Sequence, residues 1–136
     1  MPMIEETRRL GSGREVLVEL DLREPVRFDR KRLAQAFSNL LVNAVTHGKP
    51  GTPVKVCARS ADGVFELSVA NTADQIPRAI LDRLFEPFSR GGTGNYRDGL
   101  GLGLYIASEI AKSHGGTLSV VSAQEEVCFT FAIPTA

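Results

Sequence analysis

Glycine alternates with leucine in the run Gly99-Leu100-Gly101-Leu102-Gly103-Leu104, and this run constrains the chain more than any other segment. Glycine at every second position removes side chains from one line, so that backbone N–H groups can closely approach a bound phosphate chain. A helix is expected from about Leu102 to Ser113, and its positive N-terminal end would favour an anion. Gly115-Gly116 should end this helix. The run alone fits a phosphate-binding loop and a plain flexible turn about equally well, because it matches neither the Walker nor the dinucleotide-binding fingerprint.

The remaining patterns alternate between strand and helix. Asp29 is a suitable N-cap for a helix to about Val45, in which apolar residues recur at helical spacing, and Pro77–Leu84 predicts a second, short helix. Together with the strands, these elements predict an α+β two-layer sandwich, a mixed sheet with about three helices packed on one face. The predicted strands are Glu15–Leu20, Val54–Ala58, Val64–Val69, Thr117–Ser122 and Val127–Ile133.

Size and charge indicate a single domain. A chain of 136 residues can bury one core, and we expect residues 1–13 to be a flexible lead-in or linker remnant and residues 14–136 to be the domain. Sixteen basic residues balance sixteen acidic ones, which gives no support to binding of nucleic acid or a membrane surface. The spacing of Cys57 and Cys128 does not match a metal-binding motif, and we expect both to be reduced thiols. With no membrane-spanning run and no signal-peptide core, we expect a cytoplasmic domain.

Two asparagines on the first predicted helix are candidate ligands. Asn39 and Asn43 lie four positions apart, so both side chains project from one helical face. Amide oxygens are hard ligands that suit Mg²⁺ shared with substrate phosphates. For this pair taken alone, an ordinary solvated polar face is the commoner explanation.

The order of these segments resembles the histidine kinase branch of the ATPase superfamily shared with gyrase, Hsp90 and the mismatch-repair protein MutL. The resemblance extends from Glu15 to Pro134 and implies binding of ATP and Mg²⁺. The segment Asn39–Ala44 resembles the family's asparagine box, Leu84-Phe85-Glu86-Pro87-Phe88 its phenylalanine box beside the ATP lid, and Gly99–Leu104 its second glycine box.

The resemblance implies a role for individual residues. Asn43 would be the catalytic metal ligand that holds Mg²⁺, and Asn39 would line the phosphate side. His47 would lie near the nucleotide, and the loop Ser89–Asp98 would close over it. The full set of implied nucleotide contacts is Asn39, Asn43, His47, Asn71, Ile76, Phe88, Arg90, Gly99, Leu100, Gly101, Leu102, Gly103 and Leu104.

The adenine-recognising position departs from the family pattern. The family's first glycine box usually reads Asp-x-Gly-x-Gly-Ile, whereas this chain has Asn71-Thr72-Ala73-Asp74-Gln75-Ile76. A carboxylate can only accept a hydrogen bond from the adenine amino group, while the amide of Asn71 can accept more weakly and can also donate. Adenine binding should therefore be retained with a weaker hydrogen bond. Asp74 is a rival candidate whose offset from Ile76 matches less well.

Three further features bear on the site. Thr46 stands where the family often carries Lys or Arg, and Arg90 or Arg97 could supply that charge or simply be solvated loop residues. Val127 replaces a threonine that the family places beside adenine. We expect His114 to cap a helix end, because neither histidine lies in the His-Glu/Asp-Leu-Arg-x-Pro context of a phosphoacceptor helix.

The resemblance implies transfer of the γ-phosphoryl group of ATP to a histidine on a separate dimerisation and phosphoacceptor domain, with a response regulator as an indirect partner. No contact with nucleic acid or membrane is expected. Two alternatives remain open at this point: an anti-sigma-factor-type serine kinase, and a degenerate module that binds a nucleotide or partner without turnover.

Overall fold

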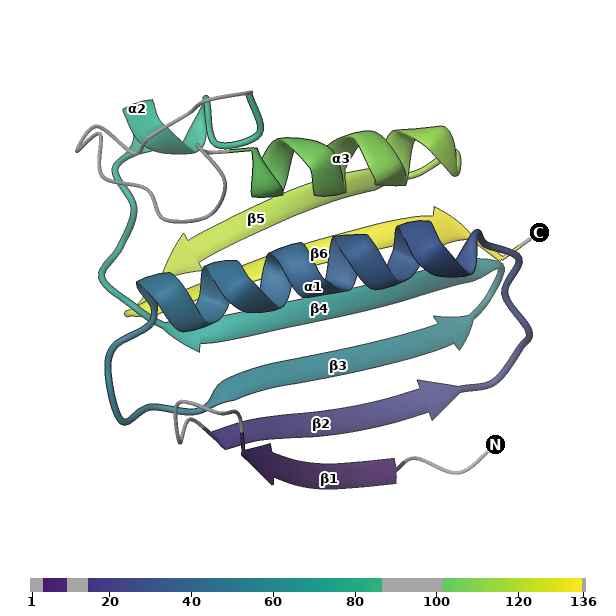
Figure 1. Ribbon diagram of the computed structural model, residues 1–136, viewed down its shortest axis with the longest axis horizontal. Coiled ribbons are helices and arrows are strands. Elements are labelled where there is room, and N and C mark those ends of the chain that lie inside the picture. The colour runs from purple at the N-terminus through teal and green to yellow at the C-terminus, as the bar shows by residue number, and fades with distance from the viewer. Residues whose placement is uncertain (1–3, 10–14, 87–101, 136) are drawn as a thin grey trace.

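The computed structural model describes residues 4–9, 15–86 and 102–135, with side chains from residue 15 onward. Within these ranges the chain forms a six-stranded mixed sheet in the order β1-β2-β3-β4-β6-β5, with helices on one face (Figure 1). β2 and β3 are parallel, and the other neighbouring pairs are antiparallel. The predicted α+β architecture is confirmed. The elements are β1 (Ile4–Arg9), β2 (Glu15–Leu22), α1 (Arg30–His47), β3 (Val54–Ala61), β4 (Val64–Thr72), α2 (Arg78–Leu81), α3 (Gly103–Ser113), β5 (Thr117–Ala123) and β6 (Glu126–Pro134).

Helix α1 begins just after its predicted N-cap and ends at His47, two residues beyond the predicted end near Val45. The carboxylate of Asp29 accepts a hydrogen bond from the backbone N–H of Arg32 at 3.1 Å, which satisfies one of the free donors of the first turn. At the other end the N–H of Gly48 donates to the carbonyl of Ala44 at 2.9 Å. Because α1 crosses over between β2 and β3, these two strands can run parallel.

The core lies between the sheet and the two long helices. Ala36 and Ala44 of α1 and Ala107 and Ala111 of α3 are all fully buried, so small side chains allow the helices to approach closely. The largest fully buried side chains include Leu40 from α1 and Phe129 and Phe131 from β6. α1 and α3 thus form one rigid layer that lies over β4, β5 and β6 (Figure 1).

The structure differs from the predicted elements in several places, of which β1, the end of β4 and the short helix are the most informative. Residues 4–9 form the edge strand β1, although the sequence suggested a flexible lead-in, because the backbone of β2 offers a free edge with which they pair. β4 continues to Thr72 because it pairs with β6 as far as Glu126, so Asn71 lies within the strand. The short helix is limited to Arg78–Leu81, and turns follow it.

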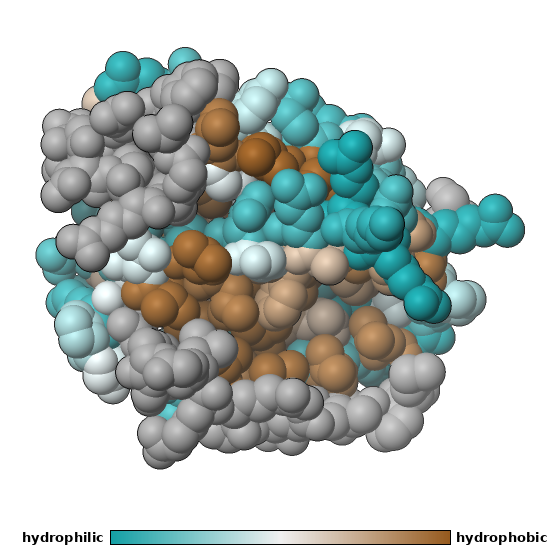
Figure 2. All heavy atoms as spheres, viewed as in Figure 1, coloured by the Kyte–Doolittle hydropathy of each residue, from teal (hydrophilic) through white to brown (hydrophobic). Residues whose placement is uncertain are grey.

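An apolar groove remains open on the helix side of β2 and β3. It has a volume of about 540 Å³ and is lined by Val18 and Leu20 of β2 and by Leu33, Phe37 and Leu41 of α1, among others. Figure 2 shows apolar surface gathered below α1 on this face of the molecule. The groove arises because no helix among the described residues covers β2. None of the helices in the described ranges combines the length and apolar character needed to cross a bilayer.

Candidate functional site

The candidate site lies at the end of the molecule where α1 ends, β4 ends and α3 begins (Figure 1). Two hydrogen bonds hold these three ends together. The side-chain amide of Asn39 donates to the carbonyl of Gly103 at 3.1 Å, and the backbone N–H of Lys49 donates to the carbonyl of Thr72 at 2.8 Å. Segments far apart in the sequence therefore meet at one fixed corner.

Asn43 is a buried polar residue on the last half of α1. Its exposed fraction is 5%, and no described residue makes a hydrogen bond with its side chain. A buried amide without a partner costs free energy, so such a group in a native fold calls for a bound water, ion or ligand. The predicted metal ligand is thus a side chain with unused hydrogen-bonding capacity.

Asn39 lies one helical turn earlier and makes a specific contact. Its amide group bonds the first residue of α3 and so joins α1 to the end of the glycine run. The amide oxygen is not used in that bond and is available to another partner. Asn39 therefore ties α1 to the start of α3.

The start of α3 has the features of an anion site. Gly103 is its first residue and Leu102 its N-cap, and no described side chain caps it. The N–H groups of the first turn have no partner within the helix. Leu104 is 4% exposed and anchors this end in the core. Phe88, Arg90, Arg97, Gly99, Leu100 and Gly101 lie outside the described residues.

Asn71 lies on the helix side of β4, between two valines. In the sheet register it is opposite Val54 of β3 and Val127 of β6. Its exposed fraction is 4%, and no described residue forms a hydrogen bond with its side chain. Like Asn43, it is a buried amide with unused hydrogen-bonding capacity.

The turn after β4 is tied to the β5–β6 hairpin. Ala73 N–H donates to the carbonyl of Glu125 at 2.9 Å, and Ile76 N–H donates to the hydroxyl of Ser122 at 2.8 Å. Lys49 contacts the carboxylates of Glu125 at 3.0 Å and Asp74 at 3.3 Å. The hydrogen bond to Glu125, followed by that to Asp74, raises the pKa of Lys49.

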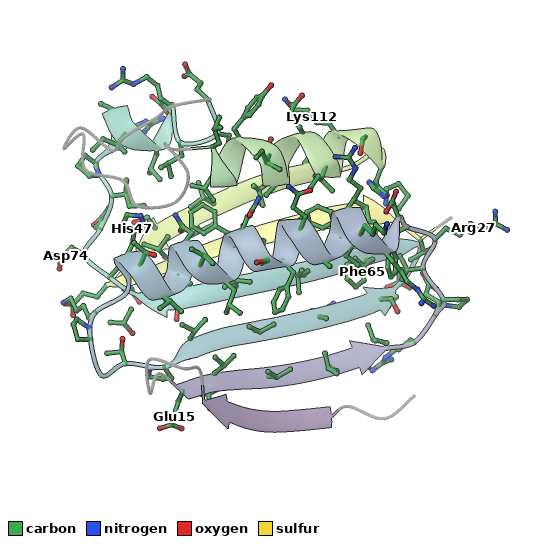
Figure 3. All side chains as sticks on the ribbon, viewed as in Figure 1. Glu15, Arg27, His47, Phe65, Asp74 and Lys112 are labelled. Atoms are coloured by element: carbon green, nitrogen blue, oxygen red, sulfur yellow. The ribbon has the colours of Figure 1, made fainter. Side chains whose placement is uncertain are left out.

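These contacts distinguish the two adenine candidates. The Asp74 side chain is 91% exposed and pairs with Lys49, whereas Asn71 is buried. Figure 3 shows Asp74 and His47 at the same end of the molecule, with His47 as the last residue of α1. Lys49, Ser122 and Glu125 could not be recognised from the sequence, because only the folded sheet brings these distant residues to the turn.

The phenylalanine box begins beside the core. Leu84 is 5% exposed, and the ring of Phe85 lies 6.2 Å from that of Phe129 with an interplanar angle of 60°. Phe85, next to the end of the described range at Glu86, thus packs against β6. His114, at the opposite end of α3, is the C-cap of that helix, as predicted.

The donor set of the site fits a metal ion shared with phosphate. No group of three or more His, Cys, Asp or Glu side chains among the described residues could hold a metal by itself. One neutral amide, Asn43, fits Mg²⁺, which keeps several waters and takes further oxygens from substrate phosphates.

Comparison with known proteins identifies the family. The family of histidine kinase-, DNA gyrase B-, and HSP90-like ATPases matches residues 28–136. The chain belongs to this family. It is 41% identical over 123 residues to the bacteriophytochrome of Pseudomonas aeruginosa, covering 88% of this chain and 16% of that protein. It is 37% identical over 108 residues to the probable sensor histidine kinase TcrY of Mycobacterium tuberculosis, covering 78% of this chain and 23% of TcrY.

Solved structures agree with this membership. The catalytic domain of histidine kinase ThkA superposes with a TM-score of 0.73 at 28% identity, covering 85% of this chain and 76% of that one. The expected resemblance to the ATP-binding catalytic domain of sensor histidine kinases is therefore confirmed. The chain spans less than a quarter of the length of the bacteriophytochrome and of TcrY.

Proposed function

We propose that this domain binds Mg²⁺–ATP and donates the γ-phosphoryl group to a histidine on a separate phosphoacceptor domain, which then passes it to a response regulator. The observation that carries the proposal is the buried amide of Asn43 on α1, which forms no hydrogen bond with any described residue, on the helix that Asn39 ties to the start of α3. The full-length histidine kinase ShkA, to which this chain is 29% identical, was solved in complex with AMPPNP.

Each predicted residue has a role in this proposal. Asn43 would hold Mg²⁺, which, when bound, neutralises phosphate charge. Asn39 would position the first turn of α3, whose N–H groups receive the phosphates. Asn71 would face the adenine. The remaining contacts are proposed for His47, Ile76, Phe88, Arg90 and the run Gly99–Leu104.

In this reaction the main task of the chain is to position ATP. The acceptor imidazole nitrogen attacks the γ-phosphorus in line, the bond to the β–γ bridging oxygen breaks, and ADP leaves with that electron pair. A domain that fixes the triphosphate and leaves the γ-phosphoryl accessible is sufficient. The two free thiols are consistent with a reducing, cytoplasmic setting for this reaction.

Calorimetric titration with ATP, with and without Mg²⁺, tests the proposal. We expect Mg²⁺ to strengthen ATP binding to the native chain, and Asn43→Ala to weaken Mg²⁺-dependent binding by at least about tenfold, because a hydrogen-bonding or metal ligand in a dry site is lost. Gln35→Ala is a matched control, since Gln35 is an exposed amide on the same helix. Its affinity should equal that of the native chain.

Phosphotransfer separates the alternatives. Incubation with labelled ATP and the parent's acceptor domain should give an acid-labile phosphohistidine on that domain. An acid-stable phosphoserine on a partner would favour the serine kinase alternative. Negligible nucleotide binding by both the native chain and Asn43→Ala would favour the degenerate module, for which the altered turn at Ala73–Gln75 is the motivating observation.

A further inference from the structure

None of the described residues fixes the orientation of the Asn71 amide. The side chain is 4% exposed, its neighbours across both strand pairs are Val54 and Val127, and no described residue forms a hydrogen bond with it. Directly opposite residues in a sheet lie about 5 Å apart, so a hydroxyl or carboxylate at either position could have held the amide in one orientation. A valine side chain has no hydrogen-bonding atom, so neither Val54 nor Val127 can hold the amide in one orientation.

Other polar groups at the turn are already paired. The N–H of Ala73 is bonded to Glu125, the N–H of Ile76 is bonded to Ser122, and Lys49 contacts Asp74 and Glu125. These groups therefore add little to recognition of a base. Among the described residues of this corner, discrimination between bases falls to Asn71.

An amide and a carboxylate read the 6-position of a purine differently. Adenine presents an amino group there, which donates, and guanine presents an oxo group, which accepts. A carboxylate accepts only, so it suits the amino group and repels the oxo group. An amide rotated by half a turn exchanges its oxygen and its NH₂ group, so it can pair with either substituent.

We infer that this site accepts 6-oxopurine nucleotides, such as GTP and ITP, as well as ATP. This inference rests on the proposed function, because it requires that a purine base faces Asn71. It goes beyond that function by naming a second class of nucleotide that the site binds.

The test compares Mg²⁺-dependent calorimetric affinities of ATP, GTP, ITP and CTP for the native chain and for Asn71→Asp. ITP isolates the 6-position, because it carries the oxo group and lacks the 2-amino group of guanine. For the native chain we expect ATP, GTP and ITP to bind within about fivefold of one another and CTP to bind at least about tenfold more weakly. For Asn71→Asp we expect ATP to be favoured over GTP and ITP by at least about tenfold, because the oxo group would meet a carboxylate.

Each outcome decides a different question. A native chain that binds ATP and rejects both GTP and ITP by more than about tenfold overturns the inference and leaves the proposed function intact. Equal binding of CTP overturns the inference as well, because the base would then not be read. Absence of binding by all four nucleotides overturns both proposals. Should Asn71→Asp fail to fold, the comparison of nucleotides on the native chain is still decisive.

Discussion

At the scale of single residues, Gly116 has less room for a side chain than Gly51, Gly63 or Gly115. A Cβ there would collide with the carbonyl oxygen of Ala132 and lie 2.7 Å from Cγ2 of Ile133. The strand β6 passes against the end of α3 at this point, so backbone atoms would have to move. We expect Gly116→Ala to lower the free energy of unfolding by about 3 kcal/mol, measured by urea denaturation.

Gly63 provides the matched control. Its φ of 80° is left-handed, but a Cβ there would meet no atom within 4 Å. Gly63→Ala should therefore cost only the backbone strain of about 1–2 kcal/mol. A smaller loss for Gly116→Ala than for Gly63→Ala would contradict the close approach of β6.

At the residue scale, the sequence predicted which amides share a helical face but not what surrounds them. Spacing alone placed Asn39 and Asn43 on one helical face, since the helical repeat is fixed by backbone geometry. The bond from Asn39 to Gly103 could not be predicted, because it joins residues 64 positions apart. The exposure of Asp74, which separates it from Asn71, likewise depends on how β4 and β6 pair.

At the scale of elements, α1 is held at its start by two side chains from different helices. Asp29 caps α1 through its carboxylate, and its own N–H donates to Nε2 of His114 at 3.1 Å. Since Nε2 accepts, the proton of the neutral ring is on Nδ1, which lies 2.9 Å from the carbonyl of Ile110 in the last turn of α3. One histidine thus connects the end of α3 to the beginning of α1.

Removing the Asp29 carboxylate should affect stability and leave binding unchanged. We expect Asp29→Ala to lower the free energy of unfolding by about 1 kcal/mol and Asp29→Asn to cost much less, because an amide oxygen still caps the helix. Nucleotide affinity, measured by calorimetry, should be the same in both variants, because Asp29 is at the opposite end of α1 from Asn43. A large loss of affinity in Asp29→Ala would show that the two ends of the helix are coupled.

Elements with local signals were predictable, and those that depend on pairing were not. α1 has an N-cap and a terminating glycine in its own sequence, so its bounds followed from local chemistry. β1 has a sequence dominated by charged residues, and it is a strand only because the edge of β2 is available. The extension of β4 to Thr72 has the same cause, since its last residues are held by β6.

At the scale of the whole molecule, the two faces of the sheet have different chemistry. The helix face is mainly apolar, while Cys57 of β3 and Cys128 of β6 lie half-buried on the other face. Burial is the largest effect that raises the pKa of each thiol above its ordinary value of 9.0. The folded state therefore holds these protons more tightly than the unfolded chain does.

This difference predicts a pH dependence. Below about pH 9 the two thiols are protonated in both the folded and the unfolded state, and their contribution to stability is complete. As the pH rises above 9, the thiols of the unfolded chain lose their protons first, so the free energy of unfolding falls. Urea denaturation across this range should show a smaller decline for the double variant Cys57→Ala, Cys128→Ala than for the native chain. Thiol labelling below pH 9 should also be slower in the folded protein than in denaturant.

The apolar groove between α1 and β2 has a practical consequence for work on this domain. Anilinonaphthalene sulfonate becomes fluorescent on exposed apolar surface and is commonly taken as a marker of partly folded states. A native fold with a groove of about 540 Å³ lined by valine, leucine and phenylalanine offers the dye a binding place before any unfolding occurs. A bright signal from a fresh preparation would then be the signature of a correctly folded sample, and Phe37→Glu, which places a charge in the groove, should dim it.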